Sequence, residues 1–217
     1  ILWEDFAMYE RKKLFCDLDD TYLDTEPYLR SVCKANGLLT FKGICIYDMR
    51  YTPMYKDIIK EVMKDYSVIP TKVGAEECMK VLETEYDIIF VSSYLEEYEA
   101  EAKRSLAKSL GKPIILININ DSTSEIGDKS KVNMQGGVFI DDILAHLVKS
   151  NASKRILMLN KYQSDLENIC KGVWTSNDLV VSDWYSITDE LMKGDEDDNL
   201  RKCICERVSE CCKQYGV

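Results

Sequence analysis

The chain has few residues that interrupt regular structure and no long apolar run. Its 217 residues include only 4 Pro and 10 Gly, which excludes collagen-like and Pro/Gly-rich low-complexity classes. No uninterrupted apolar run exceeds four residues, so neither a membrane span nor a secretory leader is predicted. We therefore expect a soluble, cytoplasmic protein with one hydrophobic core and no membrane partner.

Histidine and positive charge are also scarce. The only histidine is His146, which excludes sites built on two or more histidines and leaves most acid–base chemistry to carboxylates. The 28 Lys and Arg face 38 Asp and Glu, and the net charge of −10 argues against a nucleic-acid polymer as partner. The 9 Cys form no even, regular framework, which predicts reduced thiols.

Short apolar runs rich in β-branched residues predict a series of buried strands. Between several of them the apolar residues have helical spacing, as at Tyr98, Ala102 and Leu106. The predicted strands are 14–16, 88–91, 114–117, 138–140, 156–159 and 179–181. Strands that alternate with helices predict an α/β fold with a central parallel sheet flanked by helices.

The interval 22–85 breaks this alternation, because its patterns are mostly helical. Thr25 is a candidate N-cap, Ile58 and Val62 belong to an apolar helical stripe, and only 44–47 suggests a weak strand. We expect a helical insertion after the first strand. The predicted division is a core of 1–21 and 86–194, a helical insertion of 22–85, and an acidic linker with a C-terminal amphipathic helix at 195–217.

The C-terminal segment carries Cys-x-Cys and Cys-Cys, which raises the possibility of a zinc or redox site. The periodicity favours another interpretation, since the apolar residues and most of the thiols recur at three- and four-residue steps. We expect an amphipathic helix that uses Cys as a small hydrophobic residue. Such a face could dock on a partner or a second copy, so a homodimer remains open.

Two carboxylates, Asp17 and Asp19, directly follow the first predicted strand. In open α/β sheets ligands bind beyond the carboxyl ends of the strands. Residues i and i+2 of an extended chain face the same side, roughly 6.6 Å apart, so both carboxylates can reach one small substrate group. The alternative is a strand-ending turn in which Asp20 caps the following segment.

Further polar residues occupy comparable places. Ser92-Ser93 follows the second core strand, and the helix after it could direct its N-terminal amides toward an anion; a plain cap is the alternative. Asp141-Asp142 ends a later strand. Lys131 precedes that strand, and Lys129 competes with it for a role.

The order Asp-x-Asp-x-Thr, strand-end Ser, Lys and strand-end Asp-Asp resembles the haloacid dehalogenase (HAD) superfamily. Within it the layout is most similar to the 5'(3')-deoxyribonucleotidases of the cytosolic type C 5'-nucleotidase family, with a lysine ten residues before the Asp-Asp pair. The segment 174–185 resembles their last strand and Trp-containing helix. The similarity spans roughly 12–192 and implies a Rossmann-like HAD core with a small helical cap inserted after the first strand.

The resemblance implies a role for each motif residue. Asp17 would be the nucleophile that forms an aspartyl-phosphate, and Asp19 would protonate the leaving alcohol and then activate water. Phosphate-binding residues would be Ser92, Ser93 and Lys131, which offset the charge of the phosphoryl oxygens.

The implied cofactor is Mg²⁺, which prefers oxygen ligands. It would be held by Asp17, the backbone carbonyl of Asp19, and the pair Asp141 and Asp142. Asp142 is the expected direct ligand, and Asp141 would orient waters or Lys131.

The implied activity is that of a Mg²⁺-dependent phosphoric monoester hydrolase that acts on nucleoside 5'-monophosphates, deoxyribonucleotides in particular, in nucleotide metabolism. In the cap, Tyr22, Tyr47 and Tyr51 are candidate stacking contacts for a base, with core packing as the alternative. Asp20 stands where these nucleotidases usually have Gly. Alternatives are therefore a phosphatase of a sugar phosphate or other small metabolite, and a catalytically silent binding protein with this fold.

Overall fold

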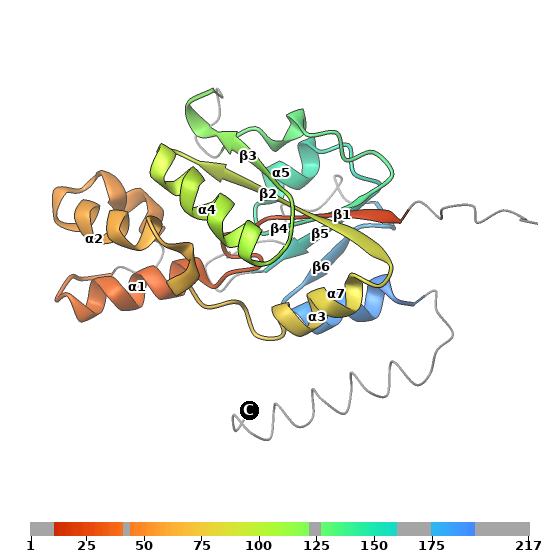
Figure 1. Ribbon diagram of the computed structural model, residues 1–217, viewed down its shortest axis with the longest axis horizontal. Helices are drawn as coiled ribbons and strands as arrows, with labels where there is room; N and C mark the ends of the chain where they lie inside the picture. The colour runs from red at the N-terminus through yellow and green to blue at the C-terminus, as the bar shows by residue number, and fades with distance from the viewer. Residues whose placement is uncertain (1–10, 41–43, 122–126, 160–174, 194–217) are drawn as a thin grey trace, which may run out of the picture.

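The computed structural model describes residues 11–40, 44–121, 127–159 and 175–193, and shows a six-stranded parallel sheet (Figure 1). The strand order is β3-β2-β1-β4-β5-β6, and Leu14 lies level with Ile88 on one side and Val138 on the other. The strands are β1 (Lys12–Cys16), β2 (Tyr86–Tyr94), β3 (Ile114–Asn118), β4 (Val138–Asp141), β5 (Lys154–Met158) and β6 (Leu179–Val181). The predicted α/β fold is confirmed.

Helices cover both faces of the sheet. Alternate residues of its central strands point to opposite sides, so each face has its own apolar cluster. The helices are α1 (Thr25–Ala35), α2 (Pro53–Met63), α3 (Ala75–Leu82), α4 (Glu97–Ser109), α5 (Leu144–Lys149) and α7 (Trp184–Leu191), with 3₁₀ turns η1 (Ile46–Tyr51), η2 (Tyr66–Val68), η3 (Ile119–Asp121) and η4 (Lys129–Lys131). Leu14 and Cys16 pack in one cluster with residues of α3, α4 and α7, whereas Phe15 packs in another with Leu147 of α5.

The inserted segment forms a helical pair beyond one end of the sheet, where α1 and α2 lie side by side (Figure 1). Its two connections to the core run next to each other: Asp24 N donates to Pro70 O and Lys72 N donates to Tyr22 O, both across 2.8–2.9 Å. The third helix of the predicted insertion, α3, lies instead against α7 beside the sheet. The boundary at residue 85 stays a prediction.

Two local expectations are wrong. The weak strand expected at 44–47 is replaced by η1, whose six residues begin at Ile46, and Thr25 is the first residue of α1 rather than its cap, which is Asp24. The expected C-terminal helix and its thiols lie outside the described residues. Within the described ranges, no helix is both long and apolar enough to cross a bilayer.

The glycine pair before β4 supplies a stability prediction. A Cβ on Gly137 would lie 2.9 Å from the backbone oxygen of Lys13 in β1, whereas a Cβ on Gly136 would meet nothing within 4 Å, although Gly136 has φ +79°. We expect Gly137→Ala to lower the free energy of unfolding by about 2–3 kcal/mol through overpacking, and Gly136→Ala by about 1 kcal/mol through its left-handed backbone. Urea denaturation of both variants checks this order; equal losses would contradict it.

Candidate active site

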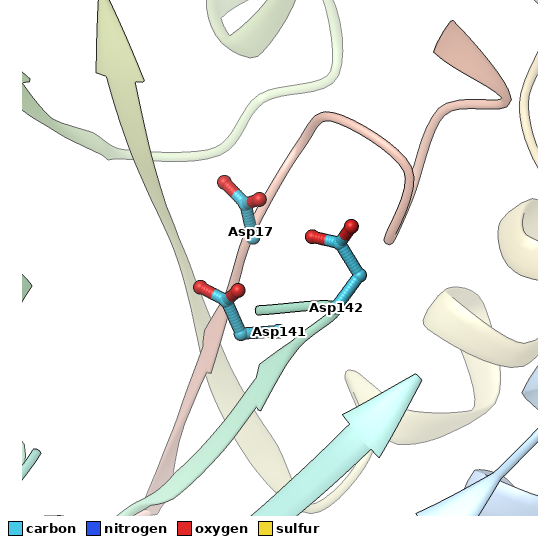
Figure 2. Close-up of side chains that lie close together, drawn as sticks. All are labelled: Asp17, Asp141 and Asp142. Carbon is cyan, nitrogen blue, oxygen red and sulfur yellow. The ribbon is translucent and has the colours of Figure 1, made fainter. Parts of the chain in front are cut away.

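The carboxyl ends of β1, β2 and β4 meet at one edge of the sheet, beside the inserted helices. Asp17 follows β1, and Asp141 and Asp142 come at the end of β4, so their carboxylates gather in the crevice beyond the strands (Figure 2). With Asp19, Ser92 and Ser93, both Asp17 and Asp142 line a cavity of about 220 Å³. The structure thus brings most of the predicted site residues to one place.

Asp17, Asp141 and Asp142 form a buried cluster of negative charge. Their nearest carboxylate oxygens lie within 4.8 Å of one another, and none of the three is more than 7% exposed. Burial raises the pKa of Asp17 to about 6, and burial with the neighbouring Asp141 raises the pKa of Asp142 well above its ordinary value. Keeping these carboxylates ionised while they are buried costs free energy, and a bound cation would lower that cost.

The lysine beside this cluster is Lys129, and not Lys131, which the sequence motif indicated. Lys129 is 1% exposed, and its Nζ lies 2.7 Å from both Asp17 Oδ1 and Asp141 Oδ2. Although burial disfavours its charge, these two carboxylates raise the pKa of Lys129. Lys131 is exposed, and its Nζ donates to Asp121 O across 3.2 Å. In the short turn η4 only the first lysine faces the core.

Asp141 is held in place by contacts on both of its oxygens. Its Oδ2 accepts from Lys129 Nζ, its Oδ1 accepts from Ile143 N at 2.7 Å, and His146 Nδ1 lies 3.1 Å from Oδ2. Burial would raise the pKa of Asp141, but Lys129 and His146 outweigh it and the pKa lies below its ordinary value. His146 is 3% exposed and lines the cavity.

Asp19 is oriented by a buried lysine that sequence reasoning missed. Lys103 Nζ lies 2.6 Å from Asp19 Oδ2 and 2.9 Å from Ser92 Oγ, and it also donates to the backbone oxygen of Ser93. Thr25 Oγ1 donates to the other oxygen of Asp19 across 3.0 Å. Lys103 directly follows Ala102, which belongs to the apolar stripe of α4. This position next to the stripe weakly indicated that the Lys103 side chain faces inward.

The two lysines reach the site from opposite faces of the sheet. Lys103 comes from α4, whose alanines pack on the face of Leu14, and Lys129 precedes Val132 and Met134 in the cluster of Phe15 on the other face. Ser92 and Ser93, being adjacent in β2, likewise point to opposite faces. Two cations therefore flank the strand ends where an anion would bind.

Ser93 carries a buried hydroxyl. Its Oγ has no hydrogen-bond partner among the described residues, and a Cβ on Gly127 would lie 2.5 Å from that oxygen. Buried polar atoms without partners are rare in native proteins and frequently mark ligand sites. This hydroxyl supports Ser93 as a candidate ligand contact.

Asp20 has a left-handed backbone with φ 55°. Asp tolerates this conformation better than most residues. Its Oδ1 accepts from Glu26 N at 2.8 Å and so caps the start of α1, while Tyr47 Oη lies 3.4 Å from Oδ2. This hydrogen bond is the capping contact of the alternative interpretation, while Asp17 and Asp19 on the same loop line the cavity.

A pH prediction concerns Asp20. Burial raises its pKa to about 7, although the hydrogen bond from Glu26 N opposes this. The folded state therefore holds the proton more tightly than the unfolded chain, and this contribution to stability is lost as pH rises from about 4 to 7. In EDTA, we expect Asp20→Asn to gain at least about 1 kcal/mol of unfolding free energy relative to wild type between pH 4.5 and 7.5, measured by urea denaturation. A constant difference would contradict this.

The inserted segment contributes a mixed polar and aromatic wall. Tyr47, Arg50 and Tyr66 line the cavity, together with Glu99 of α4. Of the three predicted base-stacking residues, only Tyr47 is among the lining residues. Tyr22 does not line the cavity: it is 2% exposed and packs on Phe90 and Trp184. Tyr51 is 70% exposed and also lies outside the lining residues.

The residues present fit a divalent cation. Among the described residues, the three buried carboxylates lie beside one buried lysine and one histidine. Burial and the neighbouring carboxylates raise the pKa of both Asp17 and Asp142, so a cation bound beside them would offset their negative charge. All the side-chain ligand atoms of this cluster are oxygens, which Mg²⁺ prefers. Asp17 and Asp142 line the cavity whereas Asp141 does not, so Asp17 and Asp142 are the better candidates for direct ligation.

Solved structures with a similar arrangement are HAD-fold proteins. A haloacid dehalogenase-like family hydrolase from Streptococcus pneumoniae has a TM-score of 0.55 at 9% identity, covering 83% of this chain and 98% of that one. The HAD-hydrolase YfnB from Bacillus subtilis, bound to magnesium, has a TM-score of 0.53 at 9% identity, covering 82% and 96%. A hydrolase from Xanthomonas campestris gives 0.51 at 11%, covering 84% and 96%. The chain has the Rossmann-like fold of HAD hydrolases.

Sequence comparisons add little. No protein-family profile matches the chain. Among curated proteins, the chain is 25% identical over 183 residues to the asparagine–tRNA ligase of Buchnera aphidicola subsp. Schizaphis graminum. That match covers 81% of this chain and only 38% of the ligase, and at this identity it assigns no family.

Proposed function

We propose that the chain is a Mg²⁺-dependent phosphomonoesterase that works through an aspartyl-phosphate on Asp17. The observation that carries this proposal is the pairing of two carboxylates with two buried lysines in one cavity. Asp17 lies against Lys129 across 2.7 Å, and Asp19 lies against Lys103 across 2.6 Å. Transfer of a phosphoryl group from a dianion needs a nucleophile, a proton donor and nearby cations that offset the negative charge. This pairing supplies all three.

In the proposed reaction, an oxygen of Asp17 bonds to phosphorus while the bond from phosphorus to the leaving alcohol breaks. Asp19 gives its proton to the leaving oxygen. Asp19 then takes a proton from a water that attacks phosphorus, which releases phosphate and restores the Asp17 carboxylate. Lys129 offsets the like-charge repulsion between Asp17 and the phosphate, in the role that the sequence motif suggested for Lys131.

The proposed cation site consists of Asp17, Asp142 and, on the resemblance, the backbone carbonyl of Asp19, with Asp141 positioning Lys129. Bound there, Mg²⁺ would neutralise charge on the phosphoryl oxygens. Ser92 and Ser93 are proposed to donate their hydroxyls to those oxygens. Ser93 Oγ, buried and without a partner, supports this assignment.

On the sequence resemblance, the proposed substrates are nucleoside 5'-monophosphates, deoxyribonucleotides first, in the cytoplasm. The second candidate class is a sugar phosphate or other small metabolite. It is favoured by the cavity of about 220 Å³, which lies below the range of about 300–1,000 Å³ for pockets that take larger ligands. It is also favoured by the absence of Tyr22 and Tyr51 from the cavity wall.

The test is phosphate release from a panel of deoxy- and ribonucleoside monophosphates, sugar phosphates and p-nitrophenyl phosphate, each with Mg²⁺ and with EDTA. We expect turnover in Mg²⁺ and loss of at least about 100-fold in EDTA. A preference for deoxynucleotides would support nucleoside monophosphates as the substrate class. Activity confined to small phosphates would support the class of sugar phosphates and other small metabolites. Release of phosphate from no compound would overturn the enzyme and favour a binding protein with this fold.

A further inference from the structure

The side chain of Arg50 lines the cavity without a hydrogen bond. It extends from η1 in the inserted segment, is 20% exposed, and shares the cavity with Asp17 and Asp19. Its Nε is enclosed and has no partner, and no described residue accepts a hydrogen bond from the rest of the guanidinium. A guanidinium has five N–H donors, and leaving such donors unpaired in a partly buried place is costly unless a ligand satisfies them.

The surroundings position this guanidinium but do not use its donors. Nη1 lies 3.6 Å from Glu99 Oε1, beyond hydrogen-bond distance, and the other oxygen of Glu99 accepts from Leu95 N at 2.9 Å. The rings of Tyr47 and Tyr51 have their centroids 5.9 and 5.6 Å from the central carbon of Arg50, which is the range of cation–π contacts. Charge and aromatic faces therefore hold the group in place, with its N–H edge left for another partner.

The chemistry of that partner is set by the shape of the group. The planar fork of a guanidinium matches two oxygens of a carboxylate or phosphate, and such charge-assisted pairs are the strongest hydrogen bonds that it makes. The lysines beside Asp17 and Asp19 already serve the phosphoryl end of the cavity. Arg50, which comes from the inserted segment, is available for a different part of the same molecule.

We infer that Arg50 binds a second anionic group, a carboxylate or a second phosphate, on the part of the substrate that leaves. This inference rests on the proposed phosphomonoesterase activity and specifies its substrate class. The preferred substrate is a small phosphorylated acid or bisphosphate, whose size also suits the cavity of about 220 Å³. The inference thus selects the second candidate class, small phosphorylated metabolites, over nucleoside monophosphates, which carry no second anion.

The test compares pairs of phosphomonoesters that differ in the second anion. 3-Phosphoglycerate and glycerol 3-phosphate differ by a carboxylate in place of a hydroxymethyl group, and fructose 1,6-bisphosphate and fructose 6-phosphate differ by a phosphate. We expect wild type to favour the charged member of at least one pair by at least 10-fold in kcat/KM, mostly through KM. Which pair shows the preference distinguishes the carboxylate from the second phosphate.

Substitution then assigns the preference to a residue. Arg50→Gln is expected to reduce the preference to less than about threefold, and Arg50→Lys to keep part of it. Arg104→Gln is the matched control, because Arg104 is 50% exposed on α4 and pairs with Glu97 at the surface. Circular dichroism and urea denaturation confirm that each variant is folded.

The outcomes separate this inference from the proposed function. If wild type hydrolyses p-nitrophenyl phosphate but treats both members of each pair alike, or if Arg50→Gln keeps the preference, the inference is overturned and the phosphatase stands. If no phosphate is released from any compound, calorimetry measures the affinity for phosphonoacetate, which has a carboxylate, and for ethylphosphonate, which lacks one. Binding of phosphonoacetate at least 10-fold tighter, lost in Arg50→Gln, supports the second-anion site in a binding protein; equal affinities overturn it.

Discussion

Replacing Asp17 with Asn is expected to lower kcat for p-nitrophenyl phosphate by at least about 10⁴-fold. An amide has nearly the size of the carboxylate, so the cavity keeps its shape, but it cannot form an aspartyl-phosphate. Asp17 is also a proposed ligand of the cation, so both contributions are lost together. The measurement is steady-state phosphate release in saturating Mg²⁺, with a single-turnover experiment to look for phosphate that remains on the protein.

The matched control is Asp57→Asn, which makes the same chemical change at an exposed position of α2. It is expected to keep the wild-type rate and stability within experimental error. If Asp17→Asn retained more than about one hundredth of the wild-type kcat, Asp17 would not be the nucleophile. Asp19 would then be the next candidate, because it lies in the same cavity.

The second large effect is expected at Lys129. Lys129→Met removes a buried cation that lies 2.7 Å from two buried carboxylates, and breaking such a pair typically costs about 3–5 kcal/mol. We therefore expect that loss in the free energy of unfolding at pH 7.5 in EDTA, and partial recovery on lowering the pH, because protonation of the carboxylates removes their repulsion. Phosphate release is expected to fall at least about 100-fold.

Lys131→Met is the paired variant, two residues away. Its side chain is exposed and touches only the backbone oxygen of Asp121, so its effect on stability is expected to stay within about 0.5 kcal/mol. Similar losses of activity in both variants would contradict the assignment of the buried lysine. A larger loss at Lys131 would favour the residue that the sequence motif indicated.

The six strands were predictable because each is a short apolar run, and burial on both faces of a parallel sheet requires such runs. Leu14 to Cys16 and Val138 to Ile140 lie inside the observed β1 and β4. The carboxylates were predictable for a related reason. A parallel sheet places all its carboxyl ends at one edge, so Asp17 and Asp141, each at the end of an apolar run, were expected at that edge. The pairing of β1 with β4 then brings them close together.

The lysines were not predictable to the same degree, because a charged side chain carries no periodic signal that tells burial from exposure. Lys129 and Lys131 are separated by one residue, and the backbone of η4 decides which of them faces the carboxylates. Lys103 is paired with Asp19, 84 positions away in the chain. Such a contact depends on how α4 packs on the sheet.

The sequence by itself determined the sheet, the helical insertion after the first strand and the carboxylates at the strand ends, because these depend on local apolar patterns and on the geometry of parallel strands. The tertiary structure alone decided which cations meet those carboxylates. It also decided that Tyr22 packs in the core beside Trp184, and that Arg50 reaches the cavity without a hydrogen bond to any other described residue. These contacts join residues far apart in the chain, and their energies depend on burial and orientation, which no local pattern records.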